Sequence, residues 1–297
     1  MAEPVLRVEN LKKTYKKGWR SSHVQALKGV SFQIDPGTVT GFLGANGAGK
    51  TSTIKCIFEL SFPDAGEIYY FGKKGLSNEA KTKIGFLPER PYFYEHLTGR
   101  EFLRFYGQLS LSLKRADLIE RVDKLLDRVG LSHAGARPLR GYSKGMLQRI
   151  GIAQALIHEP SFIILDEPMT GLDPDGRFEV REIIRQTAAQ GTAVFFSSHL
   201  LPDAETLCDR LVILKKGDLV FHGATKELLG KVDRGHQVTW SEGGVEKEMQ
   251  VATSAELQSL IDTVRAKRGE IQEIRPRRAT LEEAFVRIAF DPKGERT

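Results

Sequence analysis

Short apolar runs separated by polar turns dominate the first seventy residues. The runs VLRVEN, VQALKGVSFQI and VTGFLG have the alternating or continuous apolar pattern of β-strands, and GEIYYFG predicts a further strand pair. A basic polar loop, KKTYKKGWRSSH, lies between them. After the third run, TSTIKCIFEL has a helix-like pattern that ends before the turn at Pro63–Gly66. We therefore expect an antiparallel β subdomain at the N-terminus.

The apolar spacing changes to three and four residues from Leu97 to about His158, which is typical of helices. Apolar runs of buried-strand type return in PSFIILDEP and GTAVFFSSH, with the charged helical segment REIIRQTAAQ between them. Strands that alternate with helices predict a mostly parallel sheet. The expected fold class is α/β, with a helical subdomain at about residues 90–160 inserted into the core.

The last part of the chain has a different pattern. LVILKKGDLVFHG predicts a hairpin that closes the first domain near Gly230. Beyond it, HQVTW and EKEMQV indicate two strands, and Thr253–Glu256 and Thr280–Glu283 each fit a capping box that begins a helix. We therefore expect two domains, residues 1–230 and residues 231–297, the second a small α+β domain.

Composition narrows the class of protein without deciding it. Hydrophobic residues make up 40% and charged residues 28% of the 297 residues, the balance of an ordinary globular chain. No apolar run reaches the roughly 18 residues of a membrane-spanning helix, and the N-terminus lacks a signal pattern. With only Cys56 and Cys208, no disulfide framework is available, so we expect a reducing compartment, the cytoplasm. The net charge of +6 suits an anionic partner but does not choose one.

The strongest chemical signal is the segment GANGAGKT, which follows a predicted strand and precedes a predicted helix. Its glycines let backbone N–H groups converge on phosphates at a helix N-terminus. Lys50 can then reach the β- and γ-phosphates, and Thr51 can coordinate Mg²⁺. A glycine-rich turn without a ligand is the alternative. The expected nucleotide-binding residues here are Gly44, Asn46, Gly47, Gly49, Lys50, Thr51 and Ser52.

Two later strands end in residues that suit hydrolysis of a phosphate. Asp166 and Glu167 follow an apolar strand, at the edge of the sheet where α/β proteins bind ligands. Asp166 would hold Mg²⁺ through water, and Glu167 would polarise the attacking water. His199 ends another buried strand and could bind the γ-phosphate and orient that water. Taken alone, the carboxylates could be a helix cap or surface charges, and the histidine a structural residue.

Five motifs stand in a defined order: GANGAGKT, YSKGMLQR, FIILDEP, GLDP and SSH. This set resembles the ATPase subunits of ATP-binding cassette (ABC) transporters, over roughly residues 5–230. The resemblance implies a P-loop ATPase that binds ATP and Mg²⁺ and forms a head-to-tail dimer with a second copy or a close homologue. Ser143 and Gly145 match the signature positions that cap the γ-phosphate bound to the opposite subunit. A plain capped helix is the alternative for that segment.

The resemblance also implies roles for two more positions. Tyr15 matches the aromatic residue that stacks on adenine, although Trp19 in the basic loop is a possible substitute and a surface aromatic is the plainer interpretation. Asp173 matches the loop that links the two active sites across the dimer, whereas a turn aspartate before Pro174 is the rival.

Three departures from the commoner family pattern point to one branch. Glu89 stands where a glutamine usually meets Mg²⁺ and the attacking water, which keeps an oxygen ligand but adds charge. Lys144 and Met146 replace a glycine and a glutamine of the signature. These variants, and the C-terminal TLEEAF, resemble the single-domain bacterial export ATPases that work with separate permeases. The resemblance therefore implies Glu167, His199 and Glu89 as catalytic residues, and Thr51, Glu89 and Asp166 as the Mg²⁺ site.

The function expected from the sequence is an ATP-hydrolysing motor subunit, peripheral on the cytoplasmic face of the inner membrane. Its partners would be an integral membrane permease and a second cassette. The resemblance makes the aromatic stretch 90–98 a docking region for the permease, and packing of these rings in the core is the alternative. No nucleic-acid partner is expected. The alternative is a non-transport ABC ATPase that acts on ribosomes or DNA, but neither tandem cassettes nor a long coiled-coil insertion is present. A kinase or GTPase that shares only the phosphate loop would not explain the signature segment.

Overall fold

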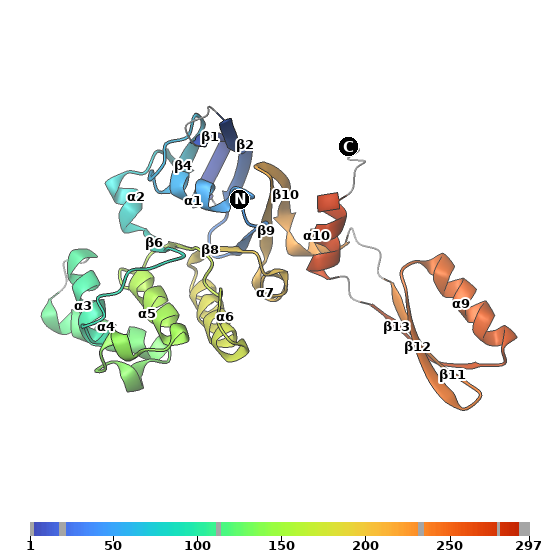
Figure 1. Cartoon of the computed structure of the whole chain (residues 1–297). Coiled ribbons are helices and arrows are strands. Elements are labelled where there is room, and N and C mark those ends of the chain that lie inside the picture. The colour runs from blue at the N-terminus through green and yellow to red at the C-terminus, as the bar shows by residue number, and fades with distance from the viewer. Residues whose placement is uncertain (1–2, 18–21, 111–113, 231–234, 278–279, 291–297) are drawn as a thin grey trace. The chain divides into compact units, whose positions relative to one another are not determined.

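The computed structural model describes residues 3–17, 22–110, 114–230, 235–277 and 280–290. It divides into two compact units, Met1–Gly223 and Ala224–Thr297 (Figure 1). The sequence pattern predicts a domain boundary after residue 230. In the structure the short helix α8, Thr225–Gly230, belongs to the second unit.

A four-stranded antiparallel sheet forms one part of the larger unit. Its strand order is β2 (Ser22–Ile34), β1 (Leu6–Lys17), β4 (Ala65–Tyr70) and β5 (Lys73–Lys74). The long strand β1 pairs antiparallel with both β2 and β4. This is the antiparallel subdomain that the N-terminal pattern predicts.

A six-stranded sheet forms the centre of the same unit. Its strand order is β10 (Asp218–Ala224), β9 (Arg210–Lys215), β3 (Val39–Leu43), β8 (Ala193–Ser198), β7 (Phe162–Leu165) and β6 (Ile84–Leu87). All pairings from β9 to β6 are parallel. Every residue of β3, β7 and β8 is buried, because helices pack on one face of the sheet and the antiparallel sheet packs on the other.

The helices of the larger unit fall into two groups (Figure 1). They are α1 (Lys50–Ile57), α2 (Asn78–Thr82), α3 (Gly99–Ser110), α4 (Arg115–Arg128), α5 (Lys144–Leu156), α6 (Pro174–Ala189) and α7 (Leu201–Leu207). Single 3₁₀ turns lie at Ser132–Ala134 and Leu139–Gly141. α3 packs against α4 and α5, at the opposite end of the unit from the antiparallel sheet, while α6 and α7 pack on β3. The expected α/β fold with its helical insertion is confirmed.

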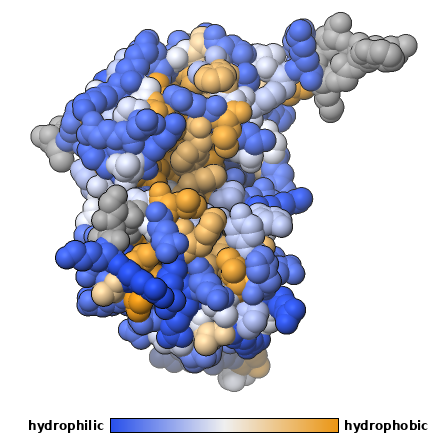
Figure 2. Space-filling model, turned by 90° about the vertical axis from the view of Figure 1, so that its left-hand side faces the viewer, coloured by the Kyte–Doolittle hydropathy of each residue, from blue (hydrophilic) through white to orange (hydrophobic). Residues whose placement is uncertain are grey.

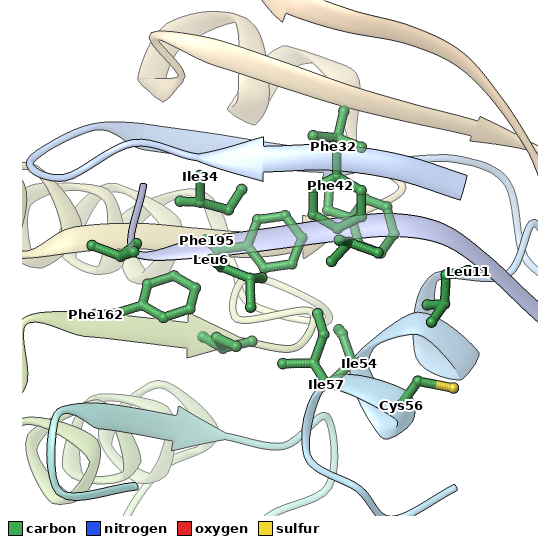
Figure 3. Packing of buried hydrophobic residues seen from close by; sticks show 14 of the residues in the cluster. Leu6, Leu11, Phe32, Ile34, Phe42, Ile54, Cys56, Ile57, Phe162 and Phe195 are labelled. Atoms are coloured by element: carbon green, nitrogen blue, oxygen red, sulfur yellow. The ribbon is translucent and has the colours of Figure 1, made fainter. Parts of the chain in front are cut away.

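A cluster of phenylalanine rings joins the two sheets (Figure 3). Phe32 comes from β2 of the antiparallel sheet, whereas Phe42 and Phe195 come from β3 and β8 of the parallel sheet. The ring centroids of Phe42 and Phe195 are 5.0 Å apart, and Phe32 lies 5.7 and 5.8 Å from them. Because aromatic pairs add to the energy of buried area, these contacts fix one sheet on the other.

The second unit is a small α+β fold. Its elements after α8 are β11 (His236–Glu242), β12 (Val245–Val251), α9 (Ser254–Ala266), β13 (Glu270–Pro276) and α10 (Leu281–Phe290). The sheet order is β12, β11, β13, with antiparallel pairs, and α9 covers it through a small apolar core. Strand β13 was not predicted, because its side chains are mostly exposed and carry little apolar alternation.

Both helices predicted in the second unit are capped by the expected threonine. The Thr253 hydroxyl accepts a hydrogen bond from the Glu256 N–H at the start of α9, and Thr280 does the same for Glu283 at α10. Each threonine oxygen satisfies an N–H group that has no partner inside the first helical turn.

Two further findings concern the whole of the described chain. Neither Cys56 nor Cys208 forms a disulfide, and both are buried. None of the described helices combines the length and the apolar character that a membrane span requires.

Replacing Phe195 by alanine is expected to destabilise the larger unit by about 3–5 kcal/mol, because the ring is fully buried and its removal leaves a cavity between the sheets. Urea unfolding followed by circular dichroism measures the change. Phe178→Ala is the control, since that ring is 56% exposed and its loss should change the unfolding free energy by less than about 1 kcal/mol. Equal effects of the two substitutions would contradict the role given to the phenylalanine cluster.

Candidate functional site

Four adjacent parallel strands end at one edge of the central sheet. β3 leads into the phosphate loop, β8 into His199, β7 into Asp166 and Glu167, and β6 into the segment with Glu89. Because parallel strands deliver their following loops to the same edge, motifs more than a hundred residues apart become neighbours.

These loops enclose a cavity of about 760 Å³. Among the residues predicted from the sequence, the cavity is lined by Asn46, Gly47, Gly49, Lys50, Thr51, Ser52, Glu89, Glu167 and His199. Further lining comes from Val24, Gln25, Ala26, Ala45, Thr170 and Lys216. The structure therefore brings the phosphate loop, both proposed catalytic acids and the histidine into one site.

The phosphate loop turns into α1 at Gly49. This residue has a φ of 113°, and a Cβ there would lie 2.7 Å from the Ala26 carbonyl oxygen, so only glycine fits the position. The eight-residue helix α1 then starts at Lys50, with its first N–H groups facing the loop. Such a helix end is a binding site for phosphate, because the N–H groups and the helix dipole both favour an anion.

Lys50 is the buried cation of the site. Its side chain is 7% exposed, and its ammonium donates a hydrogen bond to the Gly44 carbonyl oxygen at 2.6 Å. The same ammonium lies 3.4 Å from Oε1 of Glu167. Gly44 does not line the cavity, but its carbonyl oxygen holds the Lys50 ammonium in position.

Glu167 is held at both carboxylate oxygens. Oε1 faces Lys50, while Oε2 accepts a hydrogen bond from the Thr170 hydroxyl at 2.9 Å and lies 2.8 Å from Nδ1 of His199. The residue also has a left-handed backbone, with φ at 52°, which is uncommon for any residue but glycine. Its N–H donates to the Ser197 hydroxyl at 2.9 Å.

Asp166 lies behind this pair, 5% exposed, and accepts a hydrogen bond from the Ser197 hydroxyl at 2.5 Å. Burial raises the pKa of Asp166 above its usual value, and the hydrogen bond from Ser197 opposes that shift. The carboxylates of Glu89 and Glu167 raise the pKa of Asp166 further, and Lys50 lowers it. Three carboxylates thus gather near one lysine, and their oxygens, with the Thr51 hydroxyl, are donors that suit Mg²⁺.

Tyr15 does not line the cavity. Its hydroxyl is 3.4 Å from the Ser61 hydroxyl, and its ring lies 5.5 Å from the Lys13 ammonium. It pairs across the sheet with Val24, which does line the cavity. Trp19, the possible substitute, lies outside the described residues.

The signature residues also stand apart from the cavity of their own chain. Ser143 caps α5 by accepting a hydrogen bond from the Met146 N–H at 3.3 Å, and Gly145 follows in the first turn. The Lys144 ammonium occupies the space where a Cβ on Gly171 would lie, so it contacts the loop after Glu167.

Asp173 has the role of a helix cap. Its Oδ1 accepts a hydrogen bond from the Gly176 N–H at 2.8 Å and so begins α6. Like Ser143 and Gly145, it does not line the cavity.

Sequence reasoning missed two hydroxyls of the site, Thr170 and Ser197. Thr170 stands three residues after Glu167, the spacing at which a tight turn returns a side chain toward its start. Ser197 is one of two serines that end an otherwise apolar buried strand, and a buried polar residue is a signal that a hydrogen-bond partner exists. Lys216, from the turn between β9 and β10, had no such signal.

Comparisons with known proteins agree with this geometry. Residues 27–170 match the model of the ABC transporter family. An uncharacterized ABC transporter ATP-binding protein of Synechocystis is 38% identical over 95% of this chain and 84% of its own length. The daunorubicin resistance ATP-binding protein of Streptomyces coeruleorubidus is 32% identical over 99% of this chain and 98% of its own.

A solved structure is similar as well. A dimeric ATP-binding cassette in a post-hydrolysis state, bound to ADP and phosphate, is 25% identical, with a TM-score of 0.66 over 74% of this chain and 98% of the cassette. The phosphate loop, the buried lysine and the carboxylate pair therefore occur in a chain that belongs to the ABC transporter family, as an ATP-binding subunit that hydrolyses ATP.

Proposed function

We propose that this chain is the motor subunit of an exporter. It binds ATP with Mg²⁺ in the cavity, pairs with a second cassette, and drives a separate permease from the cytoplasmic face of the inner membrane. The observation that supports this most is the arrangement of Lys50, Glu167 and His199 around one cavity at the N-terminus of α1. The cavity thus has a cation that can bind phosphate and a carboxylate that can act as the base for the attacking water. A histidine contacts that carboxylate. These groups suit ATP hydrolysis.

The proposed steps of ATP hydrolysis follow from the contacts between these side chains. Lys50 binds the β- and γ-phosphate oxygens, and Glu167 takes a proton from the attacking water. With a proton on each ring nitrogen, His199 can donate a hydrogen bond from Nδ1 to Glu167 and another from Nε2 to the γ-phosphate. Glu167 and His199 thereby act as one unit on the water and the phosphate.

Thr51, Asp166 and Glu89 are the residues that would hold Mg²⁺ in this site. When bound, the cation neutralises charge on the phosphate oxygens. Glu89 brings a full negative charge, so it attracts the cation more strongly than an amide would but donates no hydrogen bond to the water. The chain's own contribution is a set of oxygens brought together by the start of α1 and the ends of β6 and β7.

A second cassette completes the site in this proposal. Ser143, Gly145 and Asp173 lie at the N-termini of α5 and α6, outside the cavity of their own chain. A helix N-terminus with a serine hydroxyl attracts phosphate, so the signature segment of one copy suits the γ-phosphate held by the other. A similar cassette was solved as a dimer bound to ADP and phosphate, which supports the pairing of two cassettes.

The permease is proposed to dock on exposed aromatic residues. Tyr92 is 79% exposed and packs edge-on against Tyr94, which in turn contacts Phe105 on α3. Figure 2 shows apolar side chains gathered in a band on the side of the molecule where α2 and α3 lie. Exposed clusters of this kind are typical of binding surfaces, because large rings contribute much of the energy of an interface.

Export rests on two supports. The Glu89, Lys144 and TLEEAF features resemble the export branch, and a similar protein is named for daunorubicin resistance. The cargo would be chosen by the permease, since the substrate path lies there. An ATPase that acts on ribosomes or DNA is the second candidate, and the partner recovered with the chain separates the two.

Replacing Glu167 by glutamine is expected to retain ATP binding but lower turnover at least about a hundredfold, because the amide cannot accept the proton of the water. ATP hydrolysis and binding of a fluorescent ATP analogue are measured on the same preparation. Glu159→Gln is the matched control. Glu159 has the same φ of 52° but precedes β7 at its opposite end, with a side chain 76% exposed. Turnover at the wild-type rate in Glu167→Gln would exclude this residue as the base.

The docking surface can be tested by purifying the tagged chain from gently solubilised native membranes and identifying the proteins that accompany it by mass spectrometry. A polytopic membrane protein in equal amount is expected with the wild type. The Tyr92→Ala, Tyr94→Ala variant should recover at least about fivefold less of it, with ATP hydrolysis unchanged. Phe178→Ala, an exposed ring on α6, controls for general loss of a surface aromatic. Ribosomal proteins or DNA in place of a permease would support the second candidate.

A further inference from the structure

We propose that Ser197 is a positioning residue that fixes both acidic residues of the site with one hydroxyl group. The inference rests on the roles proposed above for Asp166 and Glu167. Ser197 lies near the end of β8, two residues before His199, and is fully buried. It does not line the cavity, so it acts only through its neighbours.

A single oxygen makes two different hydrogen bonds. The Ser197 Oγ donates its proton to Oδ1 of Asp166 at 2.5 Å and accepts the Glu167 backbone N–H at 2.9 Å. A hydroxyl is the side-chain group that can do both at once, because it carries one donor and two acceptor positions. The bond to the carboxylate is charge-assisted and therefore stronger than a neutral one.

This bridge solves a geometric problem at the end of β7. Successive residues of a strand point to opposite faces, yet Asp166 and Glu167 must serve the same site. The chain achieves this by placing Glu167 in a left-handed backbone conformation directly after Asp166. Such a conformation is unfavourable for a non-glycine residue, so contacts around it must hold it. The bond from the Glu167 N–H to Ser197 is one such contact, and it comes from the neighbouring strand β8.

The bridge also sets the direction of the Asp166 carboxylate. Oδ1 is occupied by the hydroxyl, which leaves Oδ2 as the oxygen that can face Mg²⁺. Removing the hydroxyl would free the carboxylate to rotate and would leave a buried N–H group without its partner. Both effects act on the site rather than on the core, because the apolar neighbours of Ser197 on β8 keep their packing.

The neighbouring residue provides a matched control. Ser198 is also buried at the end of β8, but its hydroxyl accepts the Leu200 N–H at 2.9 Å and makes no bond to either acid. A serine that serves only the local fold would behave like Ser198. A positioning serine would in addition change how Mg²⁺ contributes to nucleotide binding.

The test compares Ser197→Ala with Ser198→Ala, and Ser197→Thr with Ser197→Val. Threonine and valine have nearly the same shape, but only threonine keeps the hydroxyl. This pair therefore separates the hydrogen bonds from the effect of added volume. Three quantities are measured for each: turnover of ATP, the thermal midpoint, and the affinity for a fluorescent ATP analogue with and without Mg²⁺.

Ser197→Ala is expected to lower turnover at least about tenfold and to reduce the gain in nucleotide affinity from Mg²⁺ at least about fivefold. Binding without Mg²⁺ should stay within about twofold of the wild type, because Lys50 and the phosphate loop are untouched. Ser198→Ala should leave the gain from Mg²⁺ unchanged. Ser197→Thr should exceed Ser197→Val in both turnover and the Mg²⁺ effect.

The proposal is overturned if Ser197→Ala resembles Ser198→Ala, if threonine and valine at position 197 are equivalent, or if turnover falls while the Mg²⁺ effect is unchanged. The Glu167→Gln variant distinguishes the two levels of the argument. Full activity in Glu167→Gln would remove the role assigned to Glu167, and with it the basis for the bridge. An inactive Glu167→Gln beside a normal Ser197→Ala would overturn the bridge alone.

Discussion

The candidate site depends on the ion pair between Lys50 and Glu167. The fold of the larger unit brings these two residues together. A lysine and a glutamate with side chains 7% and 11% exposed are costly to bury unless each finds a partner. They meet because β3 and β7 are parallel strands separated only by β8, so the helix after one strand faces the turn after the other. The phenylalanine cluster holds the two sheets together and so helps to keep these strands in place.

Around the ion pair, the charged side chains of the site are held by hydrogen bonds to neighbouring protein groups. Gly44 anchors the lysine, Thr170 and His199 anchor the Glu167 carboxylate, and Ser197 anchors Asp166. Rigid groups that already stand in position need little rearrangement during a reaction, which is how a protein stabilises developing charge. The arrangement also explains why the site is built from strand ends, since strands buried on both faces hold their loops firmly.

Much of this could be predicted from the sequence, because the signals are local. The phosphate loop carries its own glycines, and the capping boxes at Thr253 and Thr280 lie within one helical turn. Contacts between strands that are far apart in the sequence produce no comparable local pattern of residues. The Ser197 bridge needs β8 beside β7, and the place of Tyr15, near Ser61 and off the cavity wall, depends on how β1 meets the chain after α1. Strand β13 escaped prediction because an exposed edge strand needs no apolar alternation.

The shared use of Lys50 has a consequence for the order of events in catalysis. The same ammonium that attracts phosphate also neutralises Glu167, so an arriving polyphosphate competes with the protein's own carboxylate for one cation. When the phosphate takes the lysine, the Glu167 carboxylate loses its counter-charge and is held by Thr170 and His199. In the role proposed for Glu167, the substrate thus frees the carboxylate that activates the attacking water, whereas without phosphate that carboxylate stays paired with Lys50.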